Sequence, residues 1–395
     1  MHTRKDIFQM VSSIALPRIM RIGGGAAGEL GGVLAGLGLS RPLLVTDAFL
    51  VSTGAADRLL ANLRDAGLEG EVFSKTVPDP TTDSLIGGLE AVAAHRADCL
   101  VGFGGGSPMD TAKALGLLSA QGAEMRDYKA PRNNSGPALP VIAIPTTAGS
   151  GSEATQFTVI TDSATDEKML CTGLAFLPVA TIVDYELTIS MPSRLTADTG
   201  VDALTHAVEA YVSRKANAFS DGLALTAIRT IGRNIRRAYA DGADLDAREA
   251  MMFAATQAGI AFSNSSVALV HGMSRPIGAH FHVAHGLSNA MLFPAVTAFS
   301  VHAAAGRYAD CARAFGAAGQ GDPDSLAADK LVEALAVLCK DLDVPTPQSY
   351  GIDQEEWDEV TPLMAQQALA SGSPGNNPIV PTASQIEDLY AQIYS

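Results

Sequence analysis

Short, wholly apolar runs alternate with helix-like segments through the first half of the chain. Buried strands are predicted at residues 43–46, 99–103 and 141–144, and helices follow the first two of them at 55–66 and 108–118. Apolar runs separated by helices are typical of parallel strands joined by crossover connections. The pattern therefore predicts an open α/β domain over residues 1–190.

The pattern changes after Pro192. Long alanine-rich segments with helical periodicity take over, and they occupy residues 198–214, 219–240, 247–261, 302–315, 326–342 and 384–394. Because Met191-Pro192-Ser193 is a suitable point for a chain to change domain, we place the boundary there. We predict a second, all-helical domain over residues 191–395.

The composition fits a two-domain globular enzyme. Of the 395 residues, 47% are hydrophobic and 17% are charged, which excludes a disordered chain. The net charge of −15 repels phosphate backbones, so nucleic acid is not an expected partner. We expect no membrane helix, because no apolar run reaches the roughly 20 residues required, and no secretion signal follows the basic residues 1–5. Four widely spaced cysteines favour reduced thiols in a cytoplasmic protein.

Two glycine-rich loops are candidates for binding the phosphates of a nucleotide. Residues 23–28 match G-x-G-x-x-G and follow a weak strand pattern. Residues 104–110 (GGGSPMD) follow a much stronger buried strand, and Pro108 falls in the first helical turn. Glycines let backbone N–H groups approach a pyrophosphate closely, and Ser107 adds a hydroxyl donor. The agreement of strand, turn and helix favours the second loop, and a tight packing turn is the alternative for either.

Polar residues also follow the other two predicted strands. Asp47 comes directly after the first, where an acidic side chain binds a ribose 2′-hydroxyl and repels the 2′-phosphate of NADP. An ordinary N-cap aspartate is an equally open alternative. Residues 146–153 (TTAGSGSE) follow the third strand, and their hydroxyls suit the binding of a polar ligand at the strand ends.

Potential metal ligands gather in the helical half. Asp202 and His206 are four residues apart on one predicted helix, and Glu209 shares their face as a candidate supporting acid. His271 and His285 each precede a glycine in apolar surroundings, where an imidazole needs a partner. One carboxylate and three neutral imidazoles can bind a first-row divalent ion and leave a position for a substrate oxygen. Hydrogen-bonded core histidines are the alternative.

These segments resemble the iron-containing (group III) alcohol dehydrogenase family. Residues 200–209 (GVDALTHAVE) resemble its first metal motif, and residues 271–273 (HGM) with 285–290 (HGLSNA) resemble its second. Residues 104–110 and 145–153 resemble its cofactor segments. The motifs occur in the order found in the family, and the resemblance extends from about Pro17 to Pro378.

The resemblance implies a Rossmann-like dinucleotide-binding domain followed by a helical metal-binding domain, the fold shared with dehydroquinate synthase. It implies hydride transfer between NAD(H) and a primary alcohol or aldehyde, with Fe²⁺ or Zn²⁺, in a homodimer or larger homo-oligomer. The implied metal ligands are Asp202, His206, His271 and His285. The implied NAD site comprises Asp47, Gly104, Gly105, Gly106, Ser107, Asp110, Thr146, Thr147, Ser150 and, more weakly, Lys168.

One position departs from the pattern of the family. Members commonly carry a second histidine, usually thought to relay the substrate's proton, four residues after the one matching His271, and here that position is Arg275. An arginine stays protonated and cannot act as a general base. His280 and His282 are then the candidates for proton relay, and departure of the proton through water and the ribose hydroxyls is the alternative. Arg275 is a candidate partner for an anionic group on the substrate, with a salt bridge inside the protein as the alternative.

Three rival functions stay open. Enzymes of the dehydroquinate-synthase or glycerol-dehydrogenase type share the glycine loop but differ in their metal motifs. A hydroxyacid–oxoacid transhydrogenase would hold its NAD tightly and turn over without added nucleotide. A degenerate homologue would bind nucleotide or metal without turnover, and Arg275 is the feature that favours it.

Overall fold

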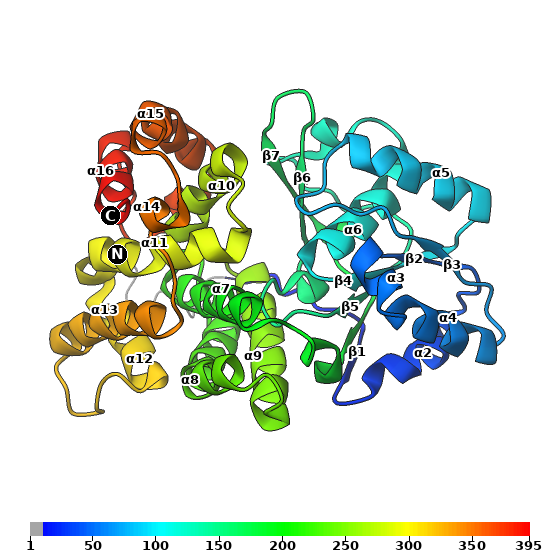
Figure 1. The fold of residues 1–395 in the computed structure, drawn as a ribbon, viewed down its shortest axis with the longest axis horizontal. Coiled ribbons are helices and arrows are strands. Elements are labelled where there is room, and N and C mark those ends of the chain that lie inside the picture. Colours follow the sequence, from blue (N-terminus) through cyan, green and yellow to red (C-terminus); the bar gives the residue numbers. More distant parts are fainter. Residues whose placement is uncertain (1–10) are drawn as a thin grey trace. The chain divides into compact units, whose positions relative to one another are not determined.

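The computed structural model describes residues 11–395. The chain divides into two compact units, one spanning Ala15–Ser190 and the other containing Met191–Ser395. Figure 1 shows strands and helices in the first and helices in the second. The first ten residues, which include the basic stretch considered for a secretion signal and the start of the predicted first domain, lie outside the described residues.

A six-stranded parallel sheet forms the centre of the first unit. Its order is β1-β8-β5-β4-β2-β3. The strands are β1 (Ile19–Ile22), β2 (Pro42–Val45), β3 (Glu71–Phe73), β4 (Cys99–Gly104), β5 (Val141–Pro145) and β8 (Ala180–Val183). The three strands predicted from apolar runs are β2, β4 and β5, which occupy the middle of the sheet and are completely buried.

The strand order reverses between β2 and β4. From β2 the chain passes to β3 on one side, and then returns to form β4 on the other side of β2. In open α/β sheets, ligands bind at the carboxyl ends of the strands next to such a reversal. The loops after β2 and β4 are therefore the expected place for a ligand in this unit.

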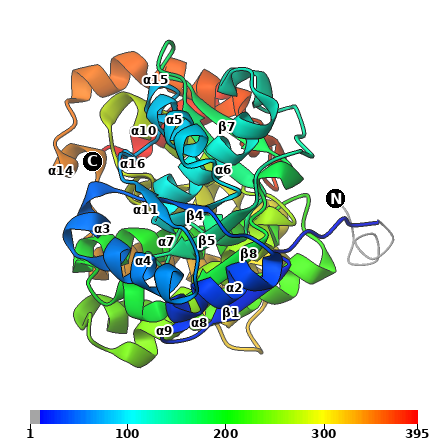
Figure 2. The same cartoon turned by 90° about the vertical axis from the view of Figure 1, so that its right-hand side faces the viewer.

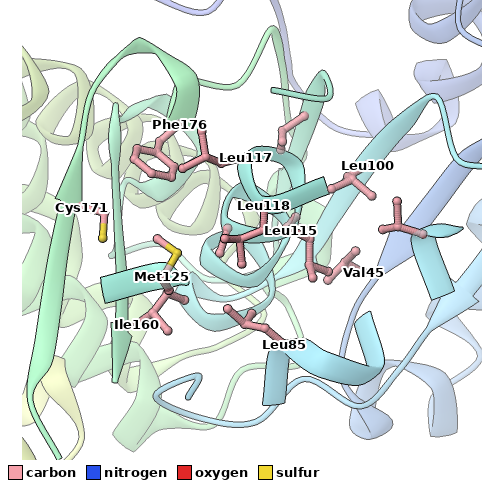
Figure 3. Close-up of a cluster of buried hydrophobic side chains, with 14 of the residues drawn as sticks. Val45, Leu85, Leu100, Leu115, Leu117, Leu118, Met125, Ile160, Cys171 and Phe176 are labelled. Atoms are coloured by element: carbon pink, nitrogen blue, oxygen red, sulfur yellow. The ribbon is translucent and has the colours of Figure 1, made fainter. Parts of the chain in front are cut away.

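Helices cover both faces of the sheet. Leu43, Val45 and Leu100 belong to one core, with side chains of α5 (Ile86–His95) and α6 (Gly106–Gln121), and Figure 3 shows part of it. Leu44 and Val101 belong to a second core, with α2 (Leu30–Leu37) and α4 (Ala55–Asp65), which lie side by side in Figure 2. Because neighbouring residues of one strand point to opposite faces, both faces are buried and the strands are apolar throughout.

An antiparallel hairpin accompanies the parallel sheet. It consists of β6 (Phe157–Thr161) and β7 (Lys168–Thr172), and β6 packs against α6. Ile160, Met169 and Cys171 contribute to the core shown in Figure 3. The sequence analysis did not predict this hairpin. Its burial alternates between half-buried and buried positions, which is a weaker signal than the fully apolar strands of the sheet.

Every element that the structure describes in the second unit is a helix. The longer ones are α7 (Ser193–Val212), α8 (Ala218–Ala240), α9 (Leu245–Ser263), α10 (Leu269–Phe281), α11 (His285–Ser300), α12 (Ala305–Phe315), α13 (Asp324–Asp341), α15 (Gln354–Ala370) and α16 (Ala383–Ile393). The predicted fold class, an α/β domain followed by an all-helical one, is confirmed.

Three of these helices were not predicted, and each contains a proline. Pro276 lies within α10, Pro294 within α11 and Pro362 within α15. A proline removes one helical hydrogen bond and usually ends a helix, so the sequence pattern was interrupted at these points. The surrounding side chains of α10 and α11 are mostly buried, and packing offsets the lost bonds.

One helical stretch of the described residues is long and apolar enough to cross a membrane on length and composition alone. It runs from His285 to Phe315, and 61% of its most apolar window is buried inside the protein. Because most of that window contacts protein, the stretch has the character of a core helix.

Candidate active site

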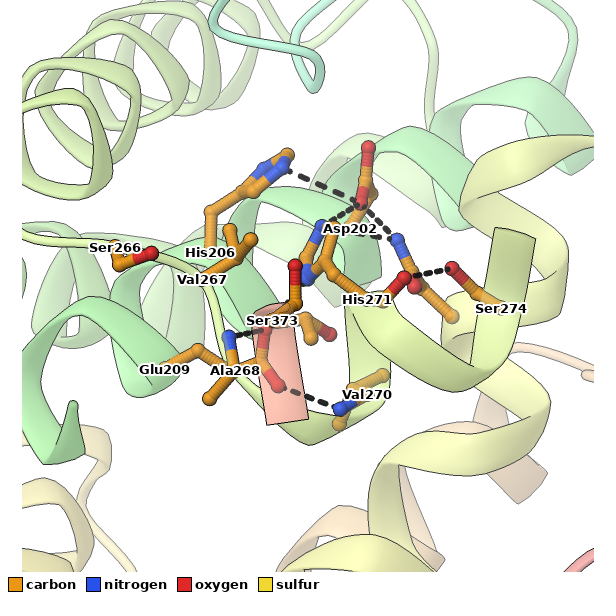
Figure 4. Close-up of polar contacts among 12 residues, drawn as sticks. Asp202, His206, Glu209, Ser266, Val267, Ala268, Val270, His271, Ser274 and Ser373 are labelled. Carbon is orange, nitrogen blue, oxygen red and sulfur yellow. Dashed lines mark hydrogen bonds and ion pairs between the residues drawn. The ribbon is translucent and has the colours of Figure 1, made fainter. Parts of the chain in front are cut away.

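Four potential metal ligands converge in the helical unit, as the sequence predicted. Asp202 and His206 lie one turn apart on α7, His271 lies in the first turn of α10, and His285 begins α11. One ligand atom from each residue lies within 4.8 Å of the other three. Figure 4 shows the imidazoles of His206 and His271 each joined by a dashed line to the Asp202 carboxylate. Three helices thus direct their side chains to one point.

The carboxylate of Asp202 is the centre of this group. Its Oδ1 lies 3.5 Å from Nε2 of His271, and 3.8 Å from Nε2 of both His206 and His285. Asp202, His206 and His271 are buried, whereas 41% of the His285 side chain is exposed. Solvent therefore contacts this group mainly at the imidazole of His285.

Glu209 holds His271 in place. It lies on α7, and its carboxylate accepts hydrogen bonds from the backbone N–H groups of Ala268 (2.9 Å) and Val270 (2.6 Å). Nδ1 of His271 lies 2.6 Å from Oε2 of Glu209. Because a carboxylate only accepts, Nδ1 carries the proton and Nε2 presents its lone pair to Asp202. Glu209 is the supporting acid expected from its spacing.

The group is strongly coupled electrostatically. Burial alone would raise the pKa of Asp202, but the imidazoles of His206, His285 and His271 outweigh burial and hold that pKa below its usual range. Burial alone would lower the pKa of His271, yet Glu209 and Asp202 together raise it. A divalent cation would supply the positive charge that these carboxylates favour.

The donor set fits a first-row divalent metal. One carboxylate oxygen and three imidazole nitrogens are typical ligands of Fe²⁺ and Zn²⁺, and His271 already has the tautomer that a ligand requires. The ring of His206 is fixed by stacking on Phe262, with 4.2 Å between centroids. These side chains are held in a binding arrangement by their neighbours.

Arg275 lies one turn beyond His271 on the same helix. Its guanidinium donates a hydrogen bond of 3.0 Å to Oγ of Ser373. No carboxylate among residues 11–395 forms an ion pair with it, so the alternative of an internal salt bridge is not observed. Burial lowers the pKa of Arg275 to about 10, with Glu209 opposing that shift, and the side chain keeps its charge at neutral pH.

The two other histidines proposed for catalysis are not brought to this group. His280 lies in the last turn of α10, and its Nε2 is 2.9 Å from Oε1 of Gln367. His282 is exposed and ends α10 with a positive φ of 54°. Neither is among the four clustered ligands, so the geometry gives no support to their proposed role as proton relays.

The loop between β4 and α6 has the features of a phosphate-binding turn. Gly104 has a φ of 146°, and a side chain there would meet Pro108 at 2.6 Å. Helix α6 begins at Gly106 without any side chain capping its first N–H groups. Uncapped N–H groups at a helix start attract anions. The loop also lies at the reversal of strand order, where a ligand is expected.

The polar loop after β5 lies beside this turn. The N–H of Thr146 donates to the carbonyl of Gly104 at 2.9 Å. A Cβ added to Gly105 would lie 3.6 Å from Thr147, and one added to Gly106 would lie 3.4 Å from Ser150. Thr147 and Ser150 therefore flank the glycines.

Asp47 follows β2 at the same edge. It caps the short helix α3 (Ala48–Ser52), and its Oδ1 accepts a hydrogen bond from the N–H of Leu50 at 2.9 Å. The N-cap role considered for this residue is therefore present. The second oxygen, Oδ2, has no hydrogen-bond partner among the described residues and is available to a ribose hydroxyl.

Asp110 and Lys168 are bound within the protein. Oδ1 of Asp110 accepts from the hydroxyl of Ser152 at 2.7 Å, and Oδ2 accepts from the N–H of Val159 at 2.9 Å. Lys168 forms an ion pair of 3.0 Å with Asp79. Both were proposed as cofactor contacts, but these partners indicate that they fix loops and strands.

The sequence analysis missed Lys113, a buried lysine of α6. Its Nζ donates to Ser152 Oγ and Phe157 O at 2.8 Å, and to the carbonyl and hydroxyl of Thr155 at 3.2 Å. Lys113 thereby joins α6 to the loop after β5 and to β6. Its signal was a lysine inside the apolar segment 111–118 (TAKALGLL).

The competing glycine loop at residues 23–28 has an internal partner. The N–H groups of Gly25 and Ala27 donate to the carboxylate of Asp184, at 3.2 and 3.0 Å. A carboxylate from the protein thus occupies the donors that a phosphate would use. The loop closes the edge strand β1 and is a packing turn.

Comparison with known proteins gives a consistent result. Residues 17–185 match the family described as iron-containing alcohol dehydrogenase, and residues 196–394 match the C-terminal domain of the Fe-containing alcohol dehydrogenase family. The NAD-dependent methanol dehydrogenase of Bacillus methanolicus is 38% identical, covering 96% of this chain and 99% of that protein.

Two solved structures are also similar along their whole lengths. A 1,3-propanediol oxidoreductase superposes with a TM-score of 0.93 at 35% identity, covering 98% of this chain and 100% of its own. The sulfoacetaldehyde reductase of Bifidobacterium kashiwanohense, solved in complex with NAD⁺, superposes with a TM-score of 0.87 at 27% identity, covering 98% and 99%.

Proposed function

Because this chain belongs to the iron-containing alcohol dehydrogenase family, we propose that Asp202, His206, His271 and His285 bind the metal at which it interconverts an alcohol and an aldehyde. The observation that carries the proposal is the convergence of these four side chains from three helices. A divalent ion held there supplies Lewis acidity, which lowers the pKa of an alcohol and polarises the carbonyl of an aldehyde.

The α/β unit binds the second reactant, NAD(H). Gly104, Gly105 and Gly106 form the turn that accepts the pyrophosphate, with the uncapped start of α6 and Ser107 as donors. Thr146, Thr147 and Ser150 flank that turn and orient the nucleotide. The free oxygen of Asp47 binds a ribose hydroxyl and disfavours NADP. Asp110, Lys113 and Lys168 act by positioning these segments.

Metal binding tests the ligand set directly. Protein reconstituted anaerobically should bind about one Fe²⁺ or Zn²⁺ per chain. The His206→Gln variant should bind it markedly more weakly, because it removes one of four ligands. Equal affinity in the variant would contradict the assignment.

The dependence of turnover on added nucleotide distinguishes the dehydrogenase from the transhydrogenase and from the degenerate homologue. The dehydrogenase requires added NADH to reduce an aldehyde. A transhydrogenase would be purified with bound nucleotide and would turn over with hydroxyacid and oxoacid alone. A degenerate homologue would bind metal and NADH without turnover of any aldehyde in a broad panel.

A finer proposal concerns the substrate, which carries an anionic group bound by Arg275. The guanidinium lies one turn from His271, is anchored by Ser373 and has no carboxylate partner in the described chain. Guanidinium geometry matches carboxylate and sulfonate groups. One structural relative is named for an aldehyde with a sulfonate group.

Steady-state kinetics with paired aldehydes tests this anchor. Arg275→Gln should raise KM for succinic semialdehyde or sulfoacetaldehyde by about 10-fold or more, the value of a charged hydrogen bond, and leave KM for butanal nearly unchanged. The Ser373→Ala variant keeps the charge and serves as the control. Equal changes for acidic and neutral aldehydes would overturn the anchor but not the dehydrogenase.

We also propose a cytoplasmic homo-oligomer. All four cysteines are free thiols, three of them buried, which suits a reducing compartment. Light scattering of the purified protein measures the mass of the assembly, and a monomeric mass would contradict the oligomer.

A further inference from the structure

A fifth polar side chain, the amide of Asn289, lies within the group of metal ligands. Asn289 follows His285 by four residues on α11, so both side chains project from one face of that helix. Its Nδ2 donates a hydrogen bond of 2.7 Å to Oδ1 of Asp202. The same nitrogen lies 3.1 Å from Nε2 of His271 and 3.2 Å from Nε2 of His285. One amide thus contacts ligand atoms from three helices.

The orientation of the amide follows from its neighbours. Asp202 is an acceptor, so the amide oxygen would be repelled from the position that the nitrogen occupies. Nε2 of His271 also carries a lone pair, because its Nδ1 proton is bound by Glu209. The opposite atom, Oδ1 of Asn289, is buried and has no hydrogen-bond partner among residues 11–395. The amide therefore donates to Asp202 although its own oxygen has no hydrogen-bond partner among these residues.

We propose that Asn289 is a positioning residue of the metal centre, which holds the Asp202 carboxylate against the imidazoles of His271 and His285 and so sets the affinity for the metal. The inference rests on the proposed metal site. A bound cation takes the imidazole lone pairs, but the carboxylate oxygen has a further lone pair for the amide. When the metal binds, the amide would therefore give up its contacts with the imidazole nitrogens of His271 and His285 and keep its bond to Asp202.

The network links two of the ligands to neighbouring helices. Glu209 fixes His271 from α7, and Asn289 fixes Asp202 from α11. Supporting hydrogen bonds of this kind orient ligands, and their loss commonly costs about 10–100-fold in metal affinity. Asn289 is completely buried, so bulk solvent does not compete with its donor in the folded protein.

Two variants separate the amide from its volume. Asn289→Ala removes the whole group, and Asn289→Leu fills the space without a donor. Zn²⁺ affinity measured by chelator competition, without NADH or substrate, should fall about 10–100-fold in both. The Co²⁺-substituted variants should also show altered visible bands, because a displaced carboxylate changes the ligand field, which a general loss of stability would not do.

The matched control is Asn377→Ala. Asn377 is equally buried in the same unit and donates to Ser300 and Ile379, so its loss should lower stability but leave Zn²⁺ affinity unchanged. Affinities of both Asn289 variants within twofold of the wild type, or tighter, would overturn the positioning role. Failure of the wild type to bind Zn²⁺ would instead overturn the metal centre itself.

Discussion

The carboxylate of Glu209 satisfies three donors at once, and its removal is the most direct residue-scale test of how the ligands are held. In Glu209→Gln, the amide has one accepting oxygen for the N–H groups of Ala268 and Val270 and for Nδ1 of His271. We predict a metal affinity lower by about 10–100-fold. We also predict a lower pKa of His271, because Glu209 raises it. Calorimetry and NMR titration measure these effects, and unchanged values would contradict the role.

Lys113 predicts a pH dependence of stability. Burial lowers its pKa from 10.5 to about 8, although Asp110 and Glu153 oppose the shift. Between pH 8 and 10.5 the unfolded chain therefore holds more protons at this residue than the folded one, and the free energy of unfolding rises with pH.

Comparison with Lys113→Met isolates this contribution. The unfolding free energy of the wild type minus that of the variant should increase from pH 7.5 to 9.5, by up to about 1.4 kcal/mol per pH unit. Denaturant titrations at several pH values measure it. A constant difference would show that the lysine titrates normally, and a shrinking one that folding raises its pKa; either would contradict the prediction.

For individual residues, the sequence predicted chemical roles better than it predicted the partners of each side chain. The sequence identified the four clustered ligands and the supporting role of Glu209, because acids and imidazoles in apolar helices require partners. It did not identify Asn289, although the spacing of four from His285 was a usable signal. The internal partners of Asp110 and Lys168 could not be predicted, because they depend on how the β6–β7 hairpin packs.

At the scale of elements, adding a methyl group at two helical glycines should change stability in opposite directions. A Cβ on Gly286, in the first turn of α11, would lie 2.6 Å from the backbone oxygen of Asp198. Gly286→Ala should therefore push α11 from α7, at a cost of about 1–3 kcal/mol, and weaken metal binding through His285. In α2, a Cβ on Gly36 meets nothing within 4 Å, and Gly36→Ala should stabilise by about 0.5–1 kcal/mol.

Thermal unfolding and metal titration of both variants check this pair. The opposite signs provide an internal control for the effect of adding a methyl group to a helix. A Gly286→Ala variant as stable and as tight in metal binding as the wild type would contradict the close approach of α7 and α11.

Element prediction was accurate where the pattern was uninterrupted. Strands β2, β4 and β5 and helices α4, α7, α8, α9, α12, α13 and α16 were identified to within about five residues at each end. Helices α10 and α11, which carry two of the four ligands, were recognised only as apolar runs around histidines. Their prolines are local exceptions that tertiary packing tolerates, and no local pattern reveals that packing.

At the scale of the whole molecule, metal and nucleotide are proposed to bind to different units. We predict that Zn²⁺ alone slows amide hydrogen exchange in α7, α10 and α11, and that NADH alone slows it around residues 104–110 and 146–155. Ligand binding stabilises the segments that it contacts, by about 2.7 kcal/mol at a concentration of 100 Kd. Protection by Zn²⁺ confined to Ala15–Ser190 would contradict the division proposed for the two domains.

NADH consumption with an aldehyde shows whether this chain is a metal-dependent NAD(H) oxidoreductase that acts at the Asp202 group. Protein reconstituted anaerobically with Fe²⁺ or Zn²⁺ is assayed beside a chelated sample, with neutral and acidic aldehydes. We expect turnover that disappears on chelation, returns with the metal and is lost in Asp202→Ala. Turnover that survives both chelation and Asp202→Ala, or no turnover despite stoichiometric metal, would contradict it.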